Sequence, residues 1–306
     1  MNAHHTHIAM KHTLLALALA CISFTSLKGA TSYNQNITSI FGSGNPDTGW
    51  TVATAPEVEL ALRAKNRENA STANVNGTYQ EPAGLQAPNN NRARWNFELS
   101  IDSGASSLDT YSYYLVIDLD PSTSVTQSAT VDVLSFWSDN SYGTSATLNG
   151  QGLEGPASTY ASTSTVVQQS QNIVFYGLNA NLDATYTYTL YAVAQGDGPN
   201  GEPLASVTIT VVVGAGGVVL PDDDGDGVPN VVDECPGTAP GDAVNTDGCS
   251  ITQSVLSECL AENPSNHGAF VSCVTQKANT LFKQDVIDKA TRTSLIRGAA
   301  KSNVGK

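Results

Sequence analysis

Residues 184–194 read "ATYTYTLYAVA", a stretch in which threonine alternates with tyrosine and leucine. Side chains on a β-strand point to opposite faces in turn, so this alternation predicts a strand with one buried face. Tyrosine, threonine and valine also favour strands over helices. Five more stretches have a similar composition and are expected to be strands: "ARWNFELSID" (93–102), "YSYYLVIDLD" (111–120), "ATVDVLSFW" (129–137), "STVVQQSQNIVFY" (164–176) and "ASVTITVVVG" (205–214).

Turn-forming residues separate these stretches, as in "PNNN" (88–91), "DSGASS" (102–107) and "GDGPNGEP" (196–203). We take "PEVELALRAKNR" (56–67) as a further strand, because a turn-like segment follows it. Long helical periodicity is absent from this part of the chain. Many short strands with turn-rich spacers predict a mainly β domain over residues 31–216, a β-sandwich of jelly-roll or immunoglobulin-like type.

The N-terminal segment has the pattern of a secretory signal. A basic stretch precedes the apolar run 14–24, which is too short to span a bilayer comfortably. We therefore expect residues 1–30 to be a signal peptide. The protein is then secreted, extracellular or on the outer cell surface, with the periplasm as an alternative. Cleavage after Ala20 would leave Cys21 as a lipid-anchored first residue, whereas cleavage near Ala30 would not, and plain secretion is favoured.

Charge is unevenly distributed along the chain. No lysine or arginine lies between residues 95 and 276, whereas that stretch holds 21 aspartates and glutamates. The last thirty residues reverse the balance, with seven lysines or arginines and two aspartates. A central surface this acidic argues against a nucleic-acid partner. It suits a protein that meets divalent cations outside the cell.

The most acidic stretch, "PDDDGDGVPNVVDECP" (221–236), has the spacing of a calcium loop. Counted from its first ligand, a twelve-residue calcium loop uses alternate positions, with a backbone carbonyl at the seventh and a glycine at the sixth. Gly227 occupies that sixth position, and Pro229 and the glycines exclude the flanking helices of an EF-hand. The ligand positions are held by Asp222, Asp224, Asp226, Val228 (through its carbonyl), Asn230 and Asp233. The alternative is an acidic, solvated linker.

The segment "DDDGDGVPNVVDECPGTAPGDAVNTDGC" (222–249) resembles the thrombospondin type 3 repeat. The resemblance lies in the aspartates that end at "D-x-C-P" and in the closing "D-G-C". It implies that the six residues named above hold Ca²⁺ as a structural cofactor. The second half of the segment carries fewer ligands, Asn245 and Asp247, so a second ion is not expected. We assign residues 217–250 to this calcium-binding segment.

Four cysteines lie beyond the signal region: Cys235, Cys249, Cys259 and Cys273. An even number of cysteines behind a secretory signal indicates disulfides. Pairing between neighbours in the sequence, 235 with 249 and 259 with 273, is the prediction. The two other connectivities stay open.

The C-terminal part, residues 251–306, is predicted to form a small helical tail. Apolar residues recur there at helical spacing, and Pro264 and Gly268 separate a first helix from a second. The stretch "NHGAFVSCV" (266–274) resembles a helical tail found at the ends of bacterial secreted proteins, often after calcium-binding repeats. This resemblance brings no chemistry with it.

The strand-rich part also resembles an uncharacterised domain of secreted Gram-negative proteins. That resemblance supports the location and the fold and implies no activity. The shared stretches are "VELALRAKNR" (58–67), "RWNFELSI" (94–101), "LDTYSYYLVIDLDP" (108–121), "VVQQSQNIVFY" (166–176) and "LASVTITVVVG" (204–214).

Sequence motifs for catalysis are scarce. Only His267 remains beyond the signal region, and its setting favours a helix start or a loop. Nucleophile-elbow, HExxH and phosphate-loop motifs are absent. A glycosidase needs only two carboxylates, so Asp118 and Asp120, on one face of a strand, are the candidates for a hydrolase. The favoured interpretation places both at a solvent-facing strand end or on a second ion, so we expect no catalytic residues.

Two strands also concentrate tyrosines, namely Tyr111, Tyr113, Tyr114, Tyr186, Tyr188 and Tyr191. Tyrosines on one face can stack against sugars, but ordinary sandwich packing with the hydroxyl at the surface is more usual.

Together these features predict a secreted or cell-surface calcium-binding protein with a non-catalytic role in binding, adhesion or extracellular structure. The expected partner is an extracellular glycan or protein. The alternatives are a carbohydrate-active hydrolase that uses paired carboxylates, and a matrix component that associates with itself. No later segment is long and apolar enough for a membrane span.

Overall fold

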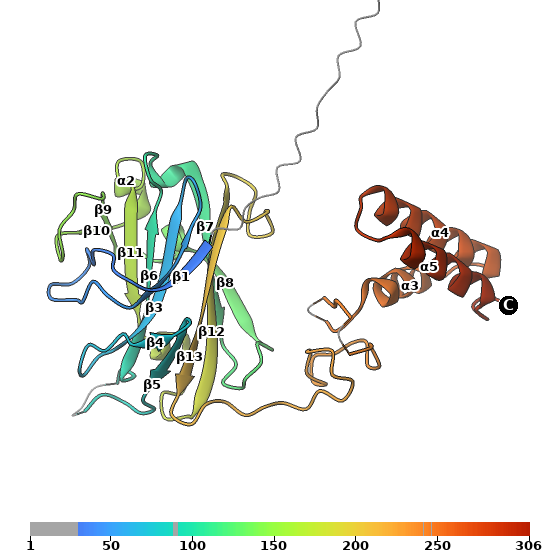
Figure 1. Cartoon of the computed structure of the whole chain (residues 1–306), viewed down its shortest axis with the longest axis horizontal. Helices are drawn as coiled ribbons and strands as arrows, with labels where there is room; N and C mark the ends of the chain where they lie inside the picture. The colour runs from blue at the N-terminus through green and yellow to red at the C-terminus, as the bar shows by residue number, and fades with distance from the viewer. Residues whose placement is uncertain (1–29, 88–90, 241, 246) are drawn as a thin grey trace, which may run out of the picture.

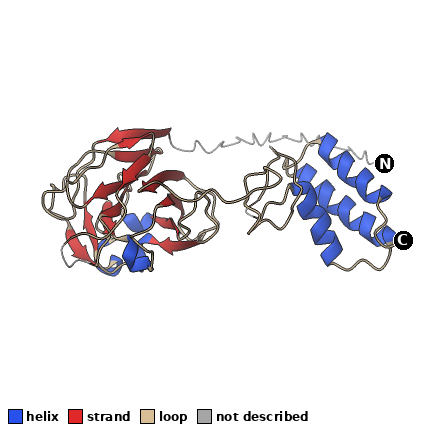
Figure 2. Cartoon of the chain, turned by 90° about the horizontal axis from the view of Figure 1, so that it is seen from below, coloured by secondary structure: helices blue, strands red, loops and turns tan. Residues whose placement is uncertain are grey.

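The computed structural model describes residues 30–87, 91–240, 242–245 and 247–306 (Figure 1). The expected signal peptide lies outside the described residues, except for Ala30, at which β1 begins. The chain forms a two-sheet unit, then a segment whose described residues form no helix or strand, then three helices (Figure 2). A mainly β fold with a helical tail is thereby confirmed.

Seven strands make up the first sheet, and six make up the second, which faces it (Figure 1). All pairings are antiparallel except that between β13 and β5. In order across the first sheet the strands are β1 (Ala30–Gln35), β2 (Trp50–Thr54), β3 (Glu59–Asn66), β6 (Trp95–Asp102), β11 (Val166–Gln171), β9 (Asn140–Gly143) and β10 (Leu153–Gly155). Across the second sheet they are β4 (Asn74–Val75), β5 (Thr78–Glu81), β13 (Ala205–Val213), β12 (Ala184–Ala194), β7 (Tyr111–Asp118) and β8 (Ser128–Asp132).

Alternation along the strands builds the core between the sheets. On β12, alternate residues from Ala184 to Ala192 are buried, as the opening stretch predicts. On β13, every second residue from Ala205 to Val213 is buried. Phe97 of β6 stacks on Tyr188 of β12 with ring centroids 4.5 Å apart, which joins the two sheets.

Four short helical turns lie between the described strands of the sandwich. They are η1 (Leu108–Thr110), α1 (Val133–Phe136), α2 (Ala157–Tyr160) and η2 (Ile173–Tyr176). The expected strands over 129–137 and 164–176 are therefore too long at their C-terminal ends. Asp132 accepts hydrogen bonds from the N–H groups of Leu134 and Ser135, and Asn172 accepts one from Val174 N–H. These caps favour a turn over a continued strand.

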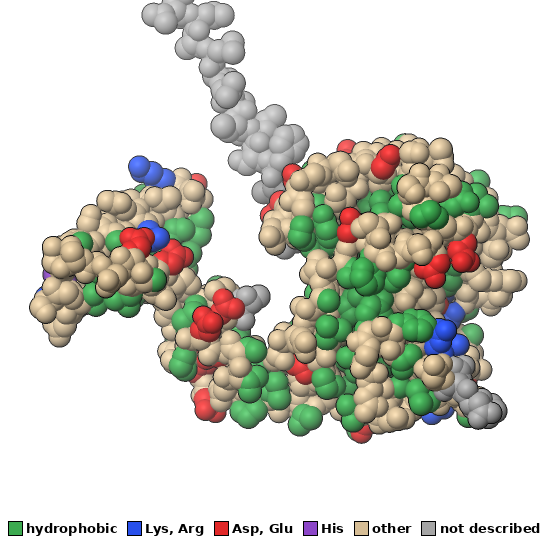
Figure 3. Space-filling model, turned by 180° about the vertical axis from the view of Figure 1, so that it is seen from behind, with side chains coloured by type: hydrophobic (Ala, Val, Ile, Leu, Met, Phe, Trp, Pro, Cys, Tyr) green, Lys and Arg blue, Asp and Glu red, His purple; other side chains and the backbone are tan. Residues whose placement is uncertain are grey.

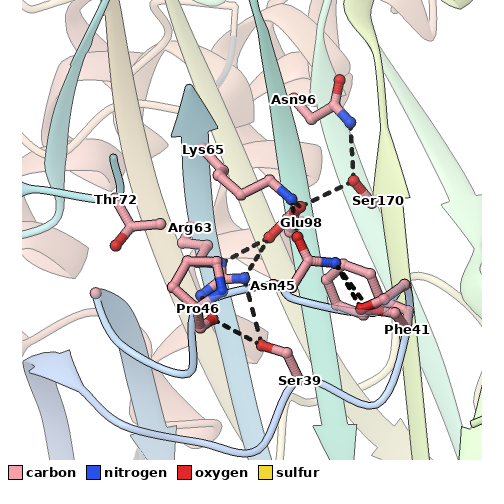
Figure 4. Close-up of polar contacts among 12 residues, drawn as sticks. Ser39, Phe41, Asn45, Pro46, Arg63, Lys65, Thr72, Asn96, Glu98 and Ser170 are labelled. Carbon is pink, nitrogen blue, oxygen red and sulfur yellow. Dashed lines mark hydrogen bonds and ion pairs between the residues drawn. The ribbon is translucent and has the colours of Figure 1, made fainter. Parts of the chain in front are cut away.

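The outer face of the first sheet carries a buried ion-pair network (Figure 4). Glu98 of β6 lies 2.6 Å from the Arg63 guanidinium and 2.7 Å from the Lys65 ammonium. Arg63 also lies over the Trp50 ring and donates hydrogen bonds to the carbonyls of Pro46 and Thr48. The loop that leads from β1 to β2 therefore closes over the charges.

The helical tail comprises α3 (Ile251–Ala261), α4 (His267–Lys283) and α5 (Lys289–Lys301). Val255, Phe270, Val274 and Leu295 form its own apolar core, separate from that of the sandwich. His267 begins α4, and its ring nitrogens contact the carbonyl oxygens of Val304 and Ala300, which confirms a structural role at a helix start. Among the described helices, none combines the length and the apolar character that a membrane span requires.

Candidate metal centre

The acidic segment between the sandwich and the tail folds around Asp222. One carboxylate oxygen of Asp222 accepts the N–H of Gly225 at 2.9 Å, and the other accepts that of Gly227 at 3.0 Å. Both glycines have positive φ, +73° and +95°, a region that glycine enters at little cost. The glycines of the calcium-loop pattern therefore bend the chain back over its first aspartate.

Three carboxylates converge in this bend. Asp222, Asp224 and Asp226 each offer one oxygen, and these oxygens lie within 4.8 Å of one another. Figure 3 shows acidic side chains gathered on the segment between the two folded units. Three like charges at this separation repel, so the arrangement costs free energy unless a cation or protons offset it.

Asp226 is the most informative member of the cluster. Its Oδ1 accepts the N–H of Val228 at 2.8 Å, whereas its Oδ2 is buried and has no hydrogen-bond partner. A buried carboxylate oxygen without a partner is costly, because it has lost water and gained nothing in exchange. A bound cation is one partner that would satisfy this oxygen.

Asp224 is held ionised by backbone donors. Its Oδ2 accepts the N–H groups of Gly237 and Thr238 at 2.7 and 2.8 Å. Partial burial acts to raise the pKa of Asp224, but these hydrogen bonds outweigh it and the pKa lies below its usual value. Asp224 therefore keeps its negative charge at neutral and mildly acidic pH, as a metal ligand must.

The other three predicted ligands have hydrogen bonds of their own within the segment. Asn230 uses its side-chain oxygen to accept the N–H of Asp223 at 2.9 Å. Asp233 accepts the N–H of Cys235 at 2.7 Å, and Val228 is placed by its own N–H bond to Asp226. The structure thus groups the carboxylates of three predicted ligands, and calcium ligation by all six residues stays a prediction.

The carboxylates of Asp226 and Asp233 both lie close to Gly248, which the sequence did not reveal. A Cβ on Gly248 would lie 2.1 Å from Asp233 Oδ1 and 3.3 Å from Asp226 Oδ2. Its φ of +74° also favours glycine. The glycine of the closing "D-G-C" therefore leaves room for two carboxylates from the first half of the segment.

A disulfide closes the segment, and hydrogen bonds tie it to the tail. Cys235 pairs with Cys249, and Cys259 pairs with Cys273, so the predicted connectivity is confirmed. The buried hydroxyl of Thr238 lies 2.8 Å from the Gly248 carbonyl oxygen and 2.8 Å from Oε1 of Gln253 on α3. Gln253 also forms a capping box with Ser250 at the start of α3. The bend and the first tail helix are therefore one hydrogen-bonded unit.

The carboxylates of Asp118 and Asp120, the candidates for a hydrolase, both accept hydrogen bonds from backbone N–H groups. Asp118 is 1% exposed and accepts the N–H groups of Asp120 and Thr187. Asp120 accepts the N–H groups of Ser122 and Thr126. Burial raises the pKa of Asp118 to about 6, although these hydrogen bonds act against it. Asp118 is buried, so the expected solvent-facing position is wrong for this residue.

A different carboxylate pair lines a cavity. Glu59 on β3 and Asp102 on β6 are register partners, and both border a cavity of about 220 Å³. Burial raises the pKa of each, and for Glu59 the charge of Asp102 adds to the effect. This pair could not be predicted from the sequence, because the two residues are far apart along the chain and meet only through strand register.

Four of the six clustered tyrosines are buried and so cannot form a sugar platform, whereas Tyr111 and Tyr114 are half-buried. Tyr113, Tyr186 and Tyr188 are at most 1% exposed, and Tyr191 is 9% exposed. The hydroxyls of Tyr113 and Tyr188 are buried without a hydrogen-bond partner. Sandwich packing is confirmed, but the expected surface position of the hydroxyls is wrong for these two residues.

Comparisons with known proteins assign no family. No family model matches the chain, and no curated protein matches it. Among solved structures, it is similar to the crystal structure of the PmoD soluble domain from Methylocystis sp. ATCC 49242 (Rockwell), with 10% identity and a TM-score of 0.25. The match covers 53% of this chain and 96% of that one. At this TM-score the likeness assigns neither the fold nor the function.

Proposed function

We propose that this is a secreted or cell-surface protein that binds Ca²⁺ structurally through the bend at residues 222–249 and has a non-catalytic binding or adhesive role. The observation that carries the proposal is the cluster of Asp222, Asp224 and Asp226, with the buried Oδ2 of Asp226 unpartnered. The two disulfides support an oxidising compartment outside the cytoplasm.

Calcium suits this donor set better than softer metals do. It takes six to eight oxygen ligands, about 2.3–2.6 Å away, in a flexible geometry. Histidine and cysteine ligands, which zinc prefers, are not available in the bend, because both of its cysteines are in a disulfide. The ion would offset the repulsion among the carboxylates and order a segment that has no apolar core of its own.

Calorimetric titration with CaCl₂ tests the ion site. We expect Asp226→Asn to weaken calcium binding about tenfold or more, which corresponds to about 1.4 kcal/mol. Asp223→Asn is the matched control, because it removes the same charge from an exposed neighbour whose side chain lies outside the cluster. Equal calcium affinity in the two variants would mean that net charge alone attracts the ion, and it would contradict the assignment of Asp226 as a ligand.

The hydrolase alternative has one observation in its favour, the Glu59 and Asp102 pair in its cavity. We expect no release of reducing sugar when the protein is incubated with a panel of polysaccharides. Release that Glu59→Gln abolishes, and that the exposed control Glu154→Gln does not, would establish the enzyme instead.

A further inference from the structure

A second candidate site lies on the sandwich, away from the acidic bend. Where α1 and η2 meet the end of β11, there is a cavity of about 280 Å³. We name it the Phe136–Phe175 pocket. Its lining residues are Phe136, Trp137, Asp139, Gln171, Phe175 and Tyr176. Its volume is just below the range of about 300–1,000 Å³ that is usual for small-molecule pockets, so it suits a ligand of one ring.

The aromatic side chains of this pocket are exposed to an unusual degree. Phe136 is 53% exposed and Phe175 is 54% exposed. The Phe136 ring meets Trp137 edge-on, with centroids 5.1 Å apart. The Arg92 guanidinium lies 4.1 Å from the centroid of the Phe175 ring. A single exposed aromatic needs no explanation, but two that border one cavity mark a surface for an apolar ring face.

Polar groups without protein partners lie beside these rings. The side-chain amide of Gln171 has no hydrogen-bond partner among the described residues, although the residue is 7% exposed. The Tyr176 hydroxyl is also buried without a partner. Asp139 is exposed and accepts one hydrogen bond, from Gln169 at 3.0 Å. The pocket therefore combines aromatic faces with donors and acceptors that the fold itself leaves unused.

We propose that the Phe136–Phe175 pocket binds a single sugar ring of an extracellular glycan. A pyranose has an apolar C–H face, which packs on an aromatic ring, and an edge of neighbouring hydroxyls. The planar carboxylate of Asp139 and the planar amide of Gln171 can each engage two such hydroxyls. A lipid would leave these polar groups unpaired, and a nucleic acid is disfavoured by the net charge of −14.

This proposal names the ligand class for the binding role proposed above, but it uses a different part of the molecule. A glycan array probed with the full secreted chain tests it, followed by titration with the free monosaccharides of the glycans that bind. We expect the double variant Phe136→Ala with Phe175→Ala to bind about tenfold more weakly or not at all. Leu148→Ala is the control, since it removes an equally apolar side chain that is 72% exposed and outside the pocket.

Separate readouts distinguish failure of this site from failure of the metal centre. The double variant is expected to keep the melting temperature and calcium affinity of the wild type, because both rings are surface side chains outside the bend. Asp226→Asn is expected to keep glycan binding. The proposal is overturned if the wild type binds no glycan, or if the double variant binds as well as Leu148→Ala. It is also overturned if the double variant only abolishes self-association, which would make the pocket an interface between copies.

Discussion

Glu81, at the end of β5, is a single residue that is expected to make the stability of the sandwich depend on pH. The side chain is buried, and its Oε2 has no hydrogen-bond partner. Burial raises its pKa to about 8, and a hydrogen bond with Asn66 offsets only part of this rise. Glu81 is therefore mostly protonated in the folded protein at neutral pH.

This burial predicts that the sandwich loses stability as the pH rises. The folded pKa lies above the ordinary value of 4.5, so the contribution is fully present below pH 4.5 and is lost as the pH rises through about 8. Melting temperatures measured from pH 5 to pH 9 should fall in the wild type and fall less in Glu81→Gln. The exposed Glu154→Gln serves as the control, and parallel profiles for all three proteins would contradict the prediction.

Glu98 pairs with the buried Arg63 and the partly buried Lys65, and it is expected to be the most sensitive charged residue of the sandwich. Glu98→Ala leaves the Arg63 guanidinium, which is 0% exposed, without its carboxylate. Removing one partner of a buried pair costs about 3–5 kcal/mol, since the remaining charge stays desolvated. Urea unfolding should report this loss.

The pair of Arg94 and Glu68 provides the comparison, because both side chains are 36% exposed. Glu68→Ala should cost about 0–1 kcal/mol, as exposed pairs do. A similar loss in both variants would show that the buried network contributes no more than a surface contact.

At the scale of elements, composition and alternation predicted seven of the thirteen described strands: β3, β6, β7, β8, β11, β12 and β13. Buried residues alternate with less buried ones along much of β7, β12 and β13, whereas β3 and β6 are buried on both faces. Composition alone could not predict that the strands end near Asp132 and Asn172. The ends depend on whether each of these side chains accepts the backbone N–H groups that follow it. These two turns place Phe136 and Phe175 at the surface, so the Phe136–Phe175 pocket was missed for the same reason.

The ligand spacing of the acidic bend could be predicted from the sequence, but the approach of its two ends to each other could not. Its pattern located Asp222, Asp224 and Asp226, which the structure brings together. It could not show that a Cβ on Gly248, at the other end of the segment, would meet the carboxylates of Asp226 and Asp233. Contacts across a disulfide-closed loop depend on tertiary geometry, which ligand spacing does not encode.

This contact predicts that Gly248 is more sensitive to substitution than other glycines of the bend. Gly248→Ala and Gly237→Ala both place a Cβ at positive φ, +74° and +99°, at a cost of about 1–2 kcal/mol each. Only at Gly248 does the Cβ meet carboxylates, since nothing lies within 4 Å at Gly237. Calcium affinity should therefore fall about tenfold further in Gly248→Ala. Equal affinities would place the ion away from Asp226 and Asp233.

At the scale of the whole molecule, the acidic segment joins the sandwich to the tail, and its described residues belong to none of the apolar cores of those two units (Figure 2). Apolar burial cannot order such a segment, so the disulfide, the hydrogen bonds to Gln253 and the proposed ion must do so. The central claim is that Ca²⁺ organises this joint between the sandwich and the tail.

Limited proteolysis at Glu234 tests that claim most directly. The Glu234 side chain is exposed and its N–H donates to the Asp247 carbonyl at 2.9 Å, so cleavage there requires the bend to open. A Glu-specific protease is needed, because no lysine or arginine lies between Arg94 and Lys277. The disulfides must be reduced in a parallel sample, since Cys235–Cys249 alone could protect the bond.

In the reduced sample, the account predicts rapid cutting at Glu234 in chelator and protection in millimolar calcium. Glu202, in the exposed loop between β12 and β13, should be cut at the same rate in both and acts as the internal standard. Equal rates at Glu234 with and without calcium would contradict the account, and the segment would then be an acidic linker that no ion organises.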